Sequence, residues 1–169
     1  MISTKAKTVW EVAKTTDVVI VPTSIGWRSD GRAVFGLGLQ RQVARRWPQL
    51  PAWYGNECRS RGERTGLIFW TPPPPRRWCA ALALLPVRPL VAQNPHLGWL
   101  SKTELPMIRE GLQTILRILH TCPPEVHFVL PMIGCLPSDK YKLSPDAVME
   151  LLASLHLDDR FILVDAEDA

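Results

Sequence analysis

Glycines concentrate between an apolar run and a basic amphipathic segment in the first third of the chain, at Gly26, Gly31, Gly36 and Gly38. Glycine reaches positive φ and, lacking a Cβ, lets a ligand approach the main chain closely. The Gly36-Leu37-Gly38 stretch immediately precedes a predicted helix, so its amides and the helix N-terminus would face an anion together. The pattern predicts a loop that binds phosphate, and a loop with glycines at turns and nothing more is the alternative.

The loop carries neither of two common phosphate-binding signatures. No Gly-Lys-Ser/Thr follows it, as a P-loop requires, and its spacing departs from the G-x-G-x-x-G of dinucleotide-binding folds.

The cysteines and histidines do not form a metal-ligating pattern. Cys58, Cys79, Cys122 and Cys135 are scattered, with no CxxC and no paired Cys/His spacing, so no metal is predicted. Cys135 beside Gly134 fits a small residue in a tight turn better than a reactive thiol. His127 lies inside an apolar run, which predicts a histidine of the core or of a cleft wall.

Composition describes a soluble globular chain with a modest basic excess. The 169 residues suit one domain, 1–169, with 46% hydrophobic and 21% charged residues. The net charge of +4 favours an anionic ligand without establishing nucleic-acid binding. No signal peptide is visible, and the longest apolar run, WCAALALLPV, is too short to span a bilayer. We expect a cytoplasmic protein with free thiols and no membrane partner.

Apolar, β-branched runs predict the strands, and they are continuous enough to be covered on both faces. The predicted strands are residues 17–23, 66–70, 79–87, 126–133 and 160–164. The proline-rich TPPPPRRW between the second and third strands lacks backbone donors and predicts a surface loop or hairpin tip.

Apolar residues at helical spacing predict three helices between these strands. The first contains Leu39, Val43, Ala44 and Trp47, ends before Pro48 and turns Arg41, Arg45 and Arg46 outward. The second covers residues 103–121, with Ser101 and Glu104 as a capping box. The third begins at Ser144 and Pro145.

Alternation of strands and helices predicts an α/β fold with a mostly parallel or mixed sheet between helical layers. In such sheets, ligands bind at the carboxyl ends of the strands. The loops after Thr23 and Ile133 leave two of those ends and are rich in permissive turn residues.

Several of these motifs, in order, resemble the macro domain, a module that binds ADP-ribose. The closest likeness is to small stand-alone macro domains of bacteria and phages. The first half of the resemblance rests on VIVPTS, DGRAVFGLGLQRQVARRWPQL and LPVR. The second half rests on HLGWLSKTELPMIREGLQTI, VLPMIGC and LDDRFILV, so that residues 17–164 are covered.

The resemblance implies a three-layer α/β/α sandwich with a mixed, mostly parallel central sheet and ADP-ribose, or a relative of it, in a cleft above the sheet. Two facing loops would hold the ligand, and no cofactor or metal is implied. On the first loop the implied ligand-binding residues are Thr23, Ile25, Gly26, Gly31, Val34, Phe35, Gly36, Leu37 and Gly38. On the second they are Met132, Ile133, Gly134, Cys135 and Leu136.

The sequence departs from the family pattern at positions that the family uses in catalysis. Ser24 stands in place of an Asn that hydrogen-bonds the distal ribose, and a hydroxyl has a shorter reach than an amide. Arg88 aligns with a catalytic Lys, and a guanidinium is a poor general acid or base. The second loop has Leu136 and Pro137 where the family has glycines. Glu11 is the nearest candidate for the acid that contacts adenine, and a surface Glu is the equal alternative.

Three functions follow as hypotheses. The first is binding of an ADP-ribose-type nucleotide. The second is an ADP-ribosyl hydrolase using Ser24 and Arg88. The third is a degenerate macro fold that acts through a protein partner. Nucleic acid enters only as an ADP-ribosylated substrate.

Overall fold

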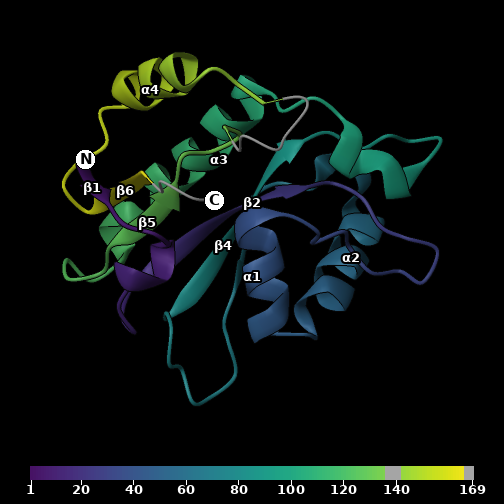
Figure 1. The fold of residues 1–169 in the computed structure, drawn as a ribbon, viewed down its shortest axis with the longest axis horizontal. Coiled ribbons are helices and arrows are strands. Elements are labelled where there is room, and N and C mark those ends of the chain that lie inside the picture. The colour runs from purple at the N-terminus through teal and green to yellow at the C-terminus, as the bar shows by residue number, and fades with distance from the viewer. Residues whose placement is uncertain (136–141, 166–169) are drawn as a thin grey trace.

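Five parallel strands and one antiparallel strand form the central sheet of the protein. A computed structural model describes residues 1–135 and 142–165. The sheet order is β1-β6-β5-β2-β4-β3, and only β3 runs antiparallel to its neighbour (Figure 1). The strands are β1 Ile2–Lys5, β2 Val18–Ser24, β3 Ile68–Trp70, β4 Ala81–Arg88, β5 Phe128–Pro131 and β6 Phe161–Asp165.

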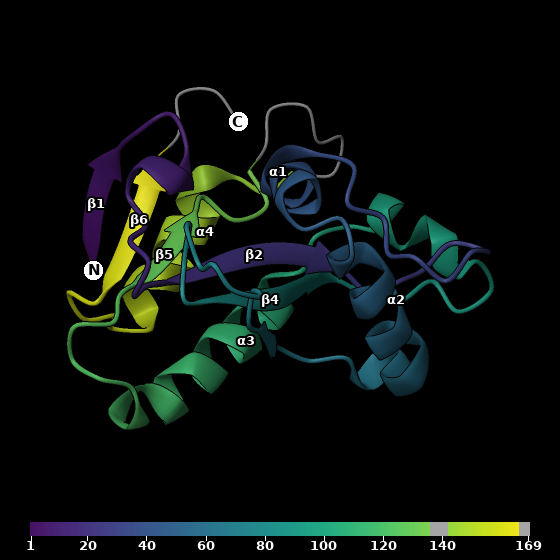
Figure 2. The ribbon, with the colours of Figure 1, turned by 90° about the horizontal axis from the view of Figure 1, so that it is seen from below.

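Helices cover both faces of the sheet, so the architecture is the expected three-layer sandwich (Figure 2). The α-helices are α1 Gly38–Arg46, α2 Leu50–Arg61, α3 Leu105–Ile118 and α4 Pro145–Ser154. Short 3-10 turns are η1 Val9–Glu11, η2 Gly62–Arg64, η3 Pro95–Leu100 and η4 Leu119–Thr121. No helix among the described residues is both long enough and apolar enough to cross a bilayer.

Alternation along β2 divides the apolar core into two halves. Val19 and Val21 pack with residues of α1 and α2, such as Val43 and Tyr54. Val18 and Ile20 point to the other face and join the cluster that α3 and α4 complete. Because both faces of the strand are buried, its sequence is continuously apolar, which is the pattern that made it recognisable.

All five predicted strands are present, with ends that differ by a few residues from the predicted ranges. β1 was not predicted. It is an exposed, four-residue edge strand without a long apolar run, and it pairs in parallel with β6. The proline-rich segment joins β3 to β4, as expected of a hairpin tip, and residues 73–78 are exposed (Figure 1).

Two local predictions are wrong. The capping box does not form, because α3 begins at Leu105 without a side-chain cap and the Ser101 hydroxyl donates to main-chain oxygens of Pro89 and Gly98 instead. Arg46 does not simply face solvent. Its guanidinium carbon lies 4.3 Å from the Trp10 ring centroid and 4.6 Å from that of Trp78, a cation–π sandwich.

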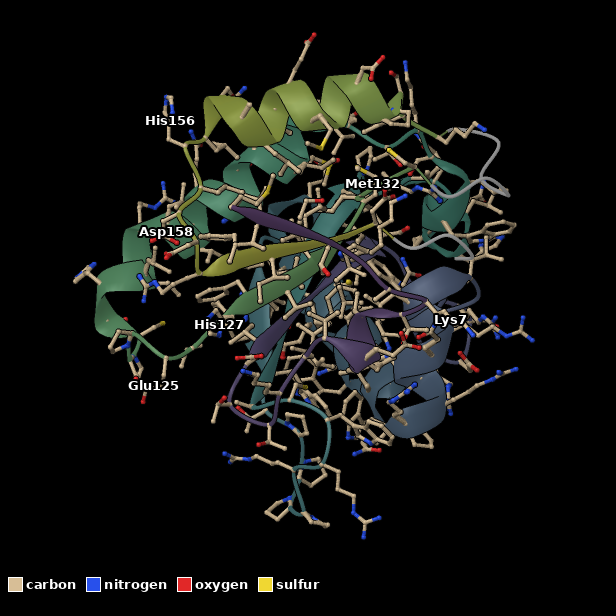
Figure 3. The ribbon with its side chains drawn as sticks, turned by 60° about the vertical axis from the view of Figure 1, so that its left-hand side comes forward. Lys7, Glu125, His127, Met132, His156 and Asp158 are labelled. Carbon is tan, nitrogen blue, oxygen red and sulfur yellow. The ribbon has the colours of Figure 1, made fainter. Side chains whose placement is uncertain are left out.

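A buried carboxylate, Asp17, joins three segments at the amino edge of the sheet. Its Oδ2 accepts from the Lys14 amide at 2.8 Å, and its Oδ1 accepts from the His127 amide at 3.2 Å. The His127 ring Nδ1 lies 3.3 Å from the same Oδ1. Figure 3 shows His127 and Glu125 at the opposite end of the strands from Lys7. His127 is therefore a structural partner at the amino ends of the strands rather than a residue of a cleft wall at their carboxyl ends.

Replacing Asp17 by Ala should destabilise the fold. The Asp17→Ala variant leaves two main-chain donors without their acceptor, and we expect a loss of about 2 to 4 kcal/mol in the free energy of unfolding. Urea denaturation measures it. Asp159→Ala, at an exposed position, is the matched control. Equal urea midpoints of unfolding for the two variants would contradict the structural role of Asp17.

Candidate functional site

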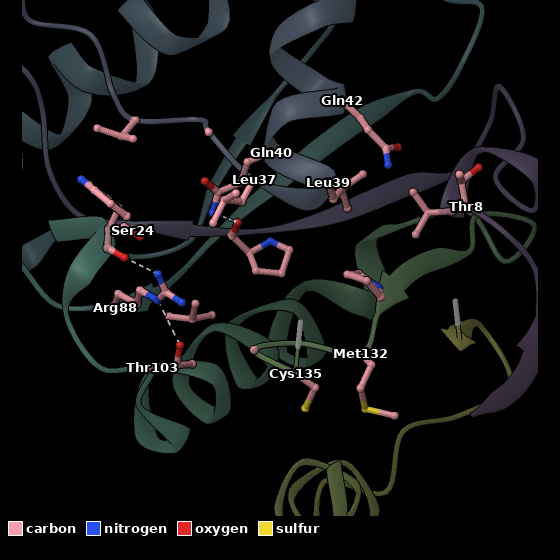
Figure 4. Close-up of a pocket in the computed structure, with 18 of the residues that line it drawn as sticks. Thr8, Ser24, Leu37, Leu39, Gln40, Gln42, Arg88, Thr103, Met132 and Cys135 are labelled. Carbon is pink, nitrogen blue, oxygen red and sulfur yellow. Dashed lines mark hydrogen bonds between the residues drawn. The ribbon is translucent and has the colours of Figure 1, made fainter. Parts of the chain in front are cut away.

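A pocket of about 270 Å³ opens where the parallel strands end (Figure 4). Pro22 and Ser24 reach it from β2, Val87 and Arg88 from β4, and Pro131 from β5. Asp165 comes from the end of β6, and Lys7 and Thr8 follow β1. Each of the five parallel strands thus contributes at its carboxyl end, the position where open α/β sheets bind ligands.

The N-terminus of α1 and the residues just before it form one wall of the pocket. Gly36, Leu37 and Leu39 line it. In the described parts of the chain, the amides of Gly36, Leu37, Gly38 and Leu39 donate no hydrogen bond, and no side chain caps the helix. Gly38 has φ +50°, which disfavours a residue with a Cβ. Among the described residues, a Cβ at Gly36 would meet Val34 alone, at 3.9 Å, so no described side chain crowds this position.

The second predicted loop forms the facing wall. Met132, Gly134 and Cys135 line the pocket, while Leu136 lies outside the described residues. Gly134 has φ +71°, and a Cβ there would lie 2.9 Å from Cγ2 of Thr103. Its carbonyl accepts from the Leu143 amide at 2.7 Å. Gly134 therefore serves a tight turn that keeps this loop close to the β4–α3 connection.

Ser24 and Arg88 lie at one end of the pocket. Ser24 is 9% exposed, and its hydroxyl has no hydrogen-bond partner within the described residues. Arg88 donates from Nε to the Thr103 hydroxyl at 3.1 Å and from Nη1 to the carbonyl of Trp99. The guanidinium is thus anchored to the segment between β4 and α3.

Several residues predicted for the ligand lie outside the pocket lining because they support the loops from behind. The Thr23 hydroxyl bonds the Tyr54 hydroxyl at 2.8 Å, and the Phe35 ring packs on the same Tyr54, 5.7 Å between centroids. Ile25 and Ile133 are buried in the two core clusters. Gly38 precedes pocket residue Leu39 without itself lining the cavity.

Gly26 allows close packing of main chains, and Gly31 provides a turn of positive φ. A Cβ on Gly26 would lie 2.3 Å from the Pro95 carbonyl oxygen. Gly31 has φ +81°, and its carbonyl oxygen would lie 2.1 Å from a Cβ on Gly55 of α2. Gly26 thus lets the first loop pack on η3, and Gly55 lets it pack on α2, whereas Gly36 faces the pocket.

Sequence reasoning missed a group of polar residues that line the pocket: Lys7, Thr8, Gln40, Gln42, Thr103 and Asp165. The carboxyl ends of the first and last strands would have pointed to Lys7 and Asp165, had β1 been recognised. Glu11, the candidate acid for adenine, does not line the pocket. It is exposed and accepts from the Lys7 amide at 3.1 Å. The described residues contain no cluster of three or more His, Cys, Asp or Glu that could hold a metal.

The geometry defines an α/β protein with a pocket at the carboxyl edge of a mixed sheet. No protein-family model matches the sequence, and no curated protein matches it. Solved structures do match over nearly the whole chain. The chain has the macrodomain fold.

Three bacterial macrodomains illustrate the similarity. That of Mycobacterium tuberculosis DarG has a TM-score of 0.68 at 20% identity, with 97% of this chain and 96% of that chain covered. The macrodomain of Thermus aquaticus DarG has a TM-score of 0.64 at 15% identity, covering 96% and 97%. A macrodomain protein from Streptomyces coelicolor has a TM-score of 0.61 at 17% identity, covering 96% and 98%. At these identities, the likeness is one of fold.

Cys135 should react slowly for a cysteine that lines a pocket. Burial raises the pKa of its thiol above the ordinary 9.0, and the nearby Lys142 ammonium offsets this only in part. Because the thiolate is the nucleophile, alkylation by iodoacetamide at about pH 8 should be slower than for a single-cysteine peptide and should rise with pH. Mass spectrometry of the Cys135 peptide measures the rate. If the pH midpoint of the alkylation rate lies at or below that of the reference peptide, the pKa of Cys135 is not raised.

Proposed function

We propose that this protein binds ADP-ribose or a closely related nucleotide, with the diphosphate against the start of α1. The observation that carries the proposal is the run of amides at Gly36, Leu37, Gly38 and Leu39, which have no acceptor within the described residues and adjoin a pocket. Unpaired N–H groups at a helix N-terminus bind phosphate, because the amides and the helix dipole act in the same direction.

The charged and polar residues of the pocket suit a ligand with a central diphosphate and a polar group on each side of it. Two basic residues, Lys7 and Arg88, line the pocket together with one carboxylate, Asp165. In Figure 4, Leu37 lies between Ser24 on one side of the pocket and Gln42 on the other. A diphosphate at the amides would thus have one arm toward Ser24 and Arg88 and the other toward Lys7 and Gln42.

The same geometry favours binding over hydrolysis. Arg88 is committed to Thr103 and to the Trp99 carbonyl, and a guanidinium hardly deprotonates. Within the described residues, no basic side chain accepts from the Ser24 hydroxyl, so nothing there activates it as a nucleophile. Ser24 and Arg88 are better suited to hold a ribose than to exchange protons with it.

A side chain at position 36 should block the ligand. In Gly36→Val the added methyl groups stand in front of the α1 amides, and we expect the affinity for ADP-ribose to fall by at least about tenfold. Isothermal titration calorimetry measures it. Gly36 does not have positive φ, so the substitution is compatible with the backbone.

Gly66→Val is the matched control for this substitution. Gly66 has open space around its Cβ position and lies outside this pocket. Wild-type protein that gives no heat with ADP-ribose, or a Gly36→Val variant that binds as the control does, would refute the proposal.

Turnover should be absent even at high protein concentration. We expect the wild-type protein to release no ADP-ribose from ADP-ribosylated protein or nucleic acid, because no base within the described residues contacts the Ser24 hydroxyl. Chromatography of the reaction detects free ADP-ribose. Release that disappears in Ser24→Ala would instead establish a hydrolase.

A further inference from the structure

Two glutamines of α1 line the pocket, and each has one end of its amide fixed by a partner of known polarity. The indole Nε1 of Trp10 donates to Oε1 of Gln42 at 2.7 Å. Nε2 of Gln40 donates to the Pro22 carbonyl at 2.7 Å. An indole N–H can only donate and a carbonyl can only accept, so these contacts settle which end of each amide is which.

The two amides therefore present opposite groups to the remaining space. The bond to Trp10 does not use the NH₂ of Gln42, and the bond to Pro22 does not use the carbonyl oxygen of Gln40. Figure 4 shows the Gln42 nitrogen directed toward the pocket, near Leu39 and Thr8. Gln42 thus turns its hydrogen-bond donors toward a ligand at this end.

The support behind Gln42 is rigid. The Trp10 ring is packed edge-on against Trp47, with centroids 5.9 Å apart, and Arg46 lies over its face at 4.3 Å. Arg46 Nη1 lies 3.4 Å from the main-chain oxygen of Gln42. A donor held in place by packed neighbours loses little entropy when it binds a ligand, so its selectivity is built in before binding.

We propose that Gln42 is a specificity-determining residue that donates its side-chain NH₂ to a hydrogen-bond acceptor on the base of the bound nucleotide, and that Trp10 is its positioning residue. The inference rests on the proposed function, which puts the diphosphate at the α1 amides and the ribose arm toward Ser24. The base-containing arm then extends toward Gln42, about 6 Å along the helix from Gly38.

Adenine presents suitable acceptors in its ring nitrogens, such as N3 and N7. A ligand without an acceptor at this end would leave the Gln42 NH₂ dehydrated and unpaired, which costs affinity. The pocket therefore selects for a base rather than merely for a phosphorylated sugar.

The test compares two ligands, ADP-ribose and ribose 5-phosphate, on the full-length protein and three variants. Gln42→Met keeps the length of the side chain and removes its NH₂. Trp10→Phe keeps an aromatic ring and removes the N–H that fixes Gln42. Gln113→Met, at an exposed position on α3, makes the same chemical change away from the pocket. Calorimetry gives the affinity for ADP-ribose, and competition gives that for ribose 5-phosphate.

We expect Gln42→Met to weaken ADP-ribose binding about tenfold and Trp10→Phe to weaken it by a smaller factor. Gln113→Met should have no effect. Ribose 5-phosphate should keep its affinity within about twofold in every variant, because it has no base. If ribose 5-phosphate does not bind the wild type measurably, the tenfold loss for ADP-ribose alone supports the proposal, since the base-containing arm then carries the affinity.

An unchanged affinity of Gln42→Met for ADP-ribose, or an equal loss for both ligands, would overturn the assignment of Gln42. Wild-type protein that binds ADP-ribose no more tightly than ribose 5-phosphate would overturn it too. Wild-type protein that binds neither ligand would refute the proposed function itself, and the two failures are therefore distinguishable.

Discussion

The parallel alignment of five neighbouring strands is the constraint on which the site depends. Because β1, β6, β5, β2 and β4 run in one direction, their carboxyl ends meet at one edge and their following loops diverge from it. Residues more than 150 positions apart in the chain, Lys7 and Asp165, come to line one pocket in this way. The helix that follows β2 then starts beside this edge, and its first amides, which have no acceptor within the described residues, adjoin the pocket.

The glycines in and around the loop between β2 and α1 have two different structural roles. Gly26 and Gly55 let main-chain segments approach each other more closely than any side chain permits. Gly36 leaves space in front of amides that have no partner in the described structure. A sequence pattern reports only that side chains are missing, and the three-dimensional neighbours decide whether a protein segment or a ligand occupies the space.

Strands buried on both faces and the amphipathic faces of α1 and α3 were predictable, because burial leaves a periodic apolar pattern. β1 was not, since a four-residue edge strand has neither length nor continuous hydrophobicity. The Trp10–Gln42 contact could not be predicted either, because it joins η1 to α1 across 32 positions and no spacing in the sequence links the two residues. The prediction that Arg46 faces solvent is wrong for a related reason. Its charge predicts solvent, while the two indole rings that enclose it come from distant segments.

Support for the pocket extends beyond the residues that line it. Thr23 and Phe35 brace the first loop through Tyr54. Thr103 does the same for Arg88 on the other side. Such second contacts fix the direction in which polar groups face, and direction matters more than mere presence when a site must distinguish donors from acceptors.

The hydrogen bond between Trp10 and Gln42 ties together the choice of amino acid at two positions. An acceptor at position 42 facing η1 needs a donor at position 10, and loss of either leaves a polar atom unpaired in a partly buried place. A substitution at one of the two positions therefore favours a compensating substitution at the other. Homologues of this chain should either keep both residues or have both replaced. The polarity of the pocket wall would then be inherited as a unit of two residues, rather than tuned one residue at a time.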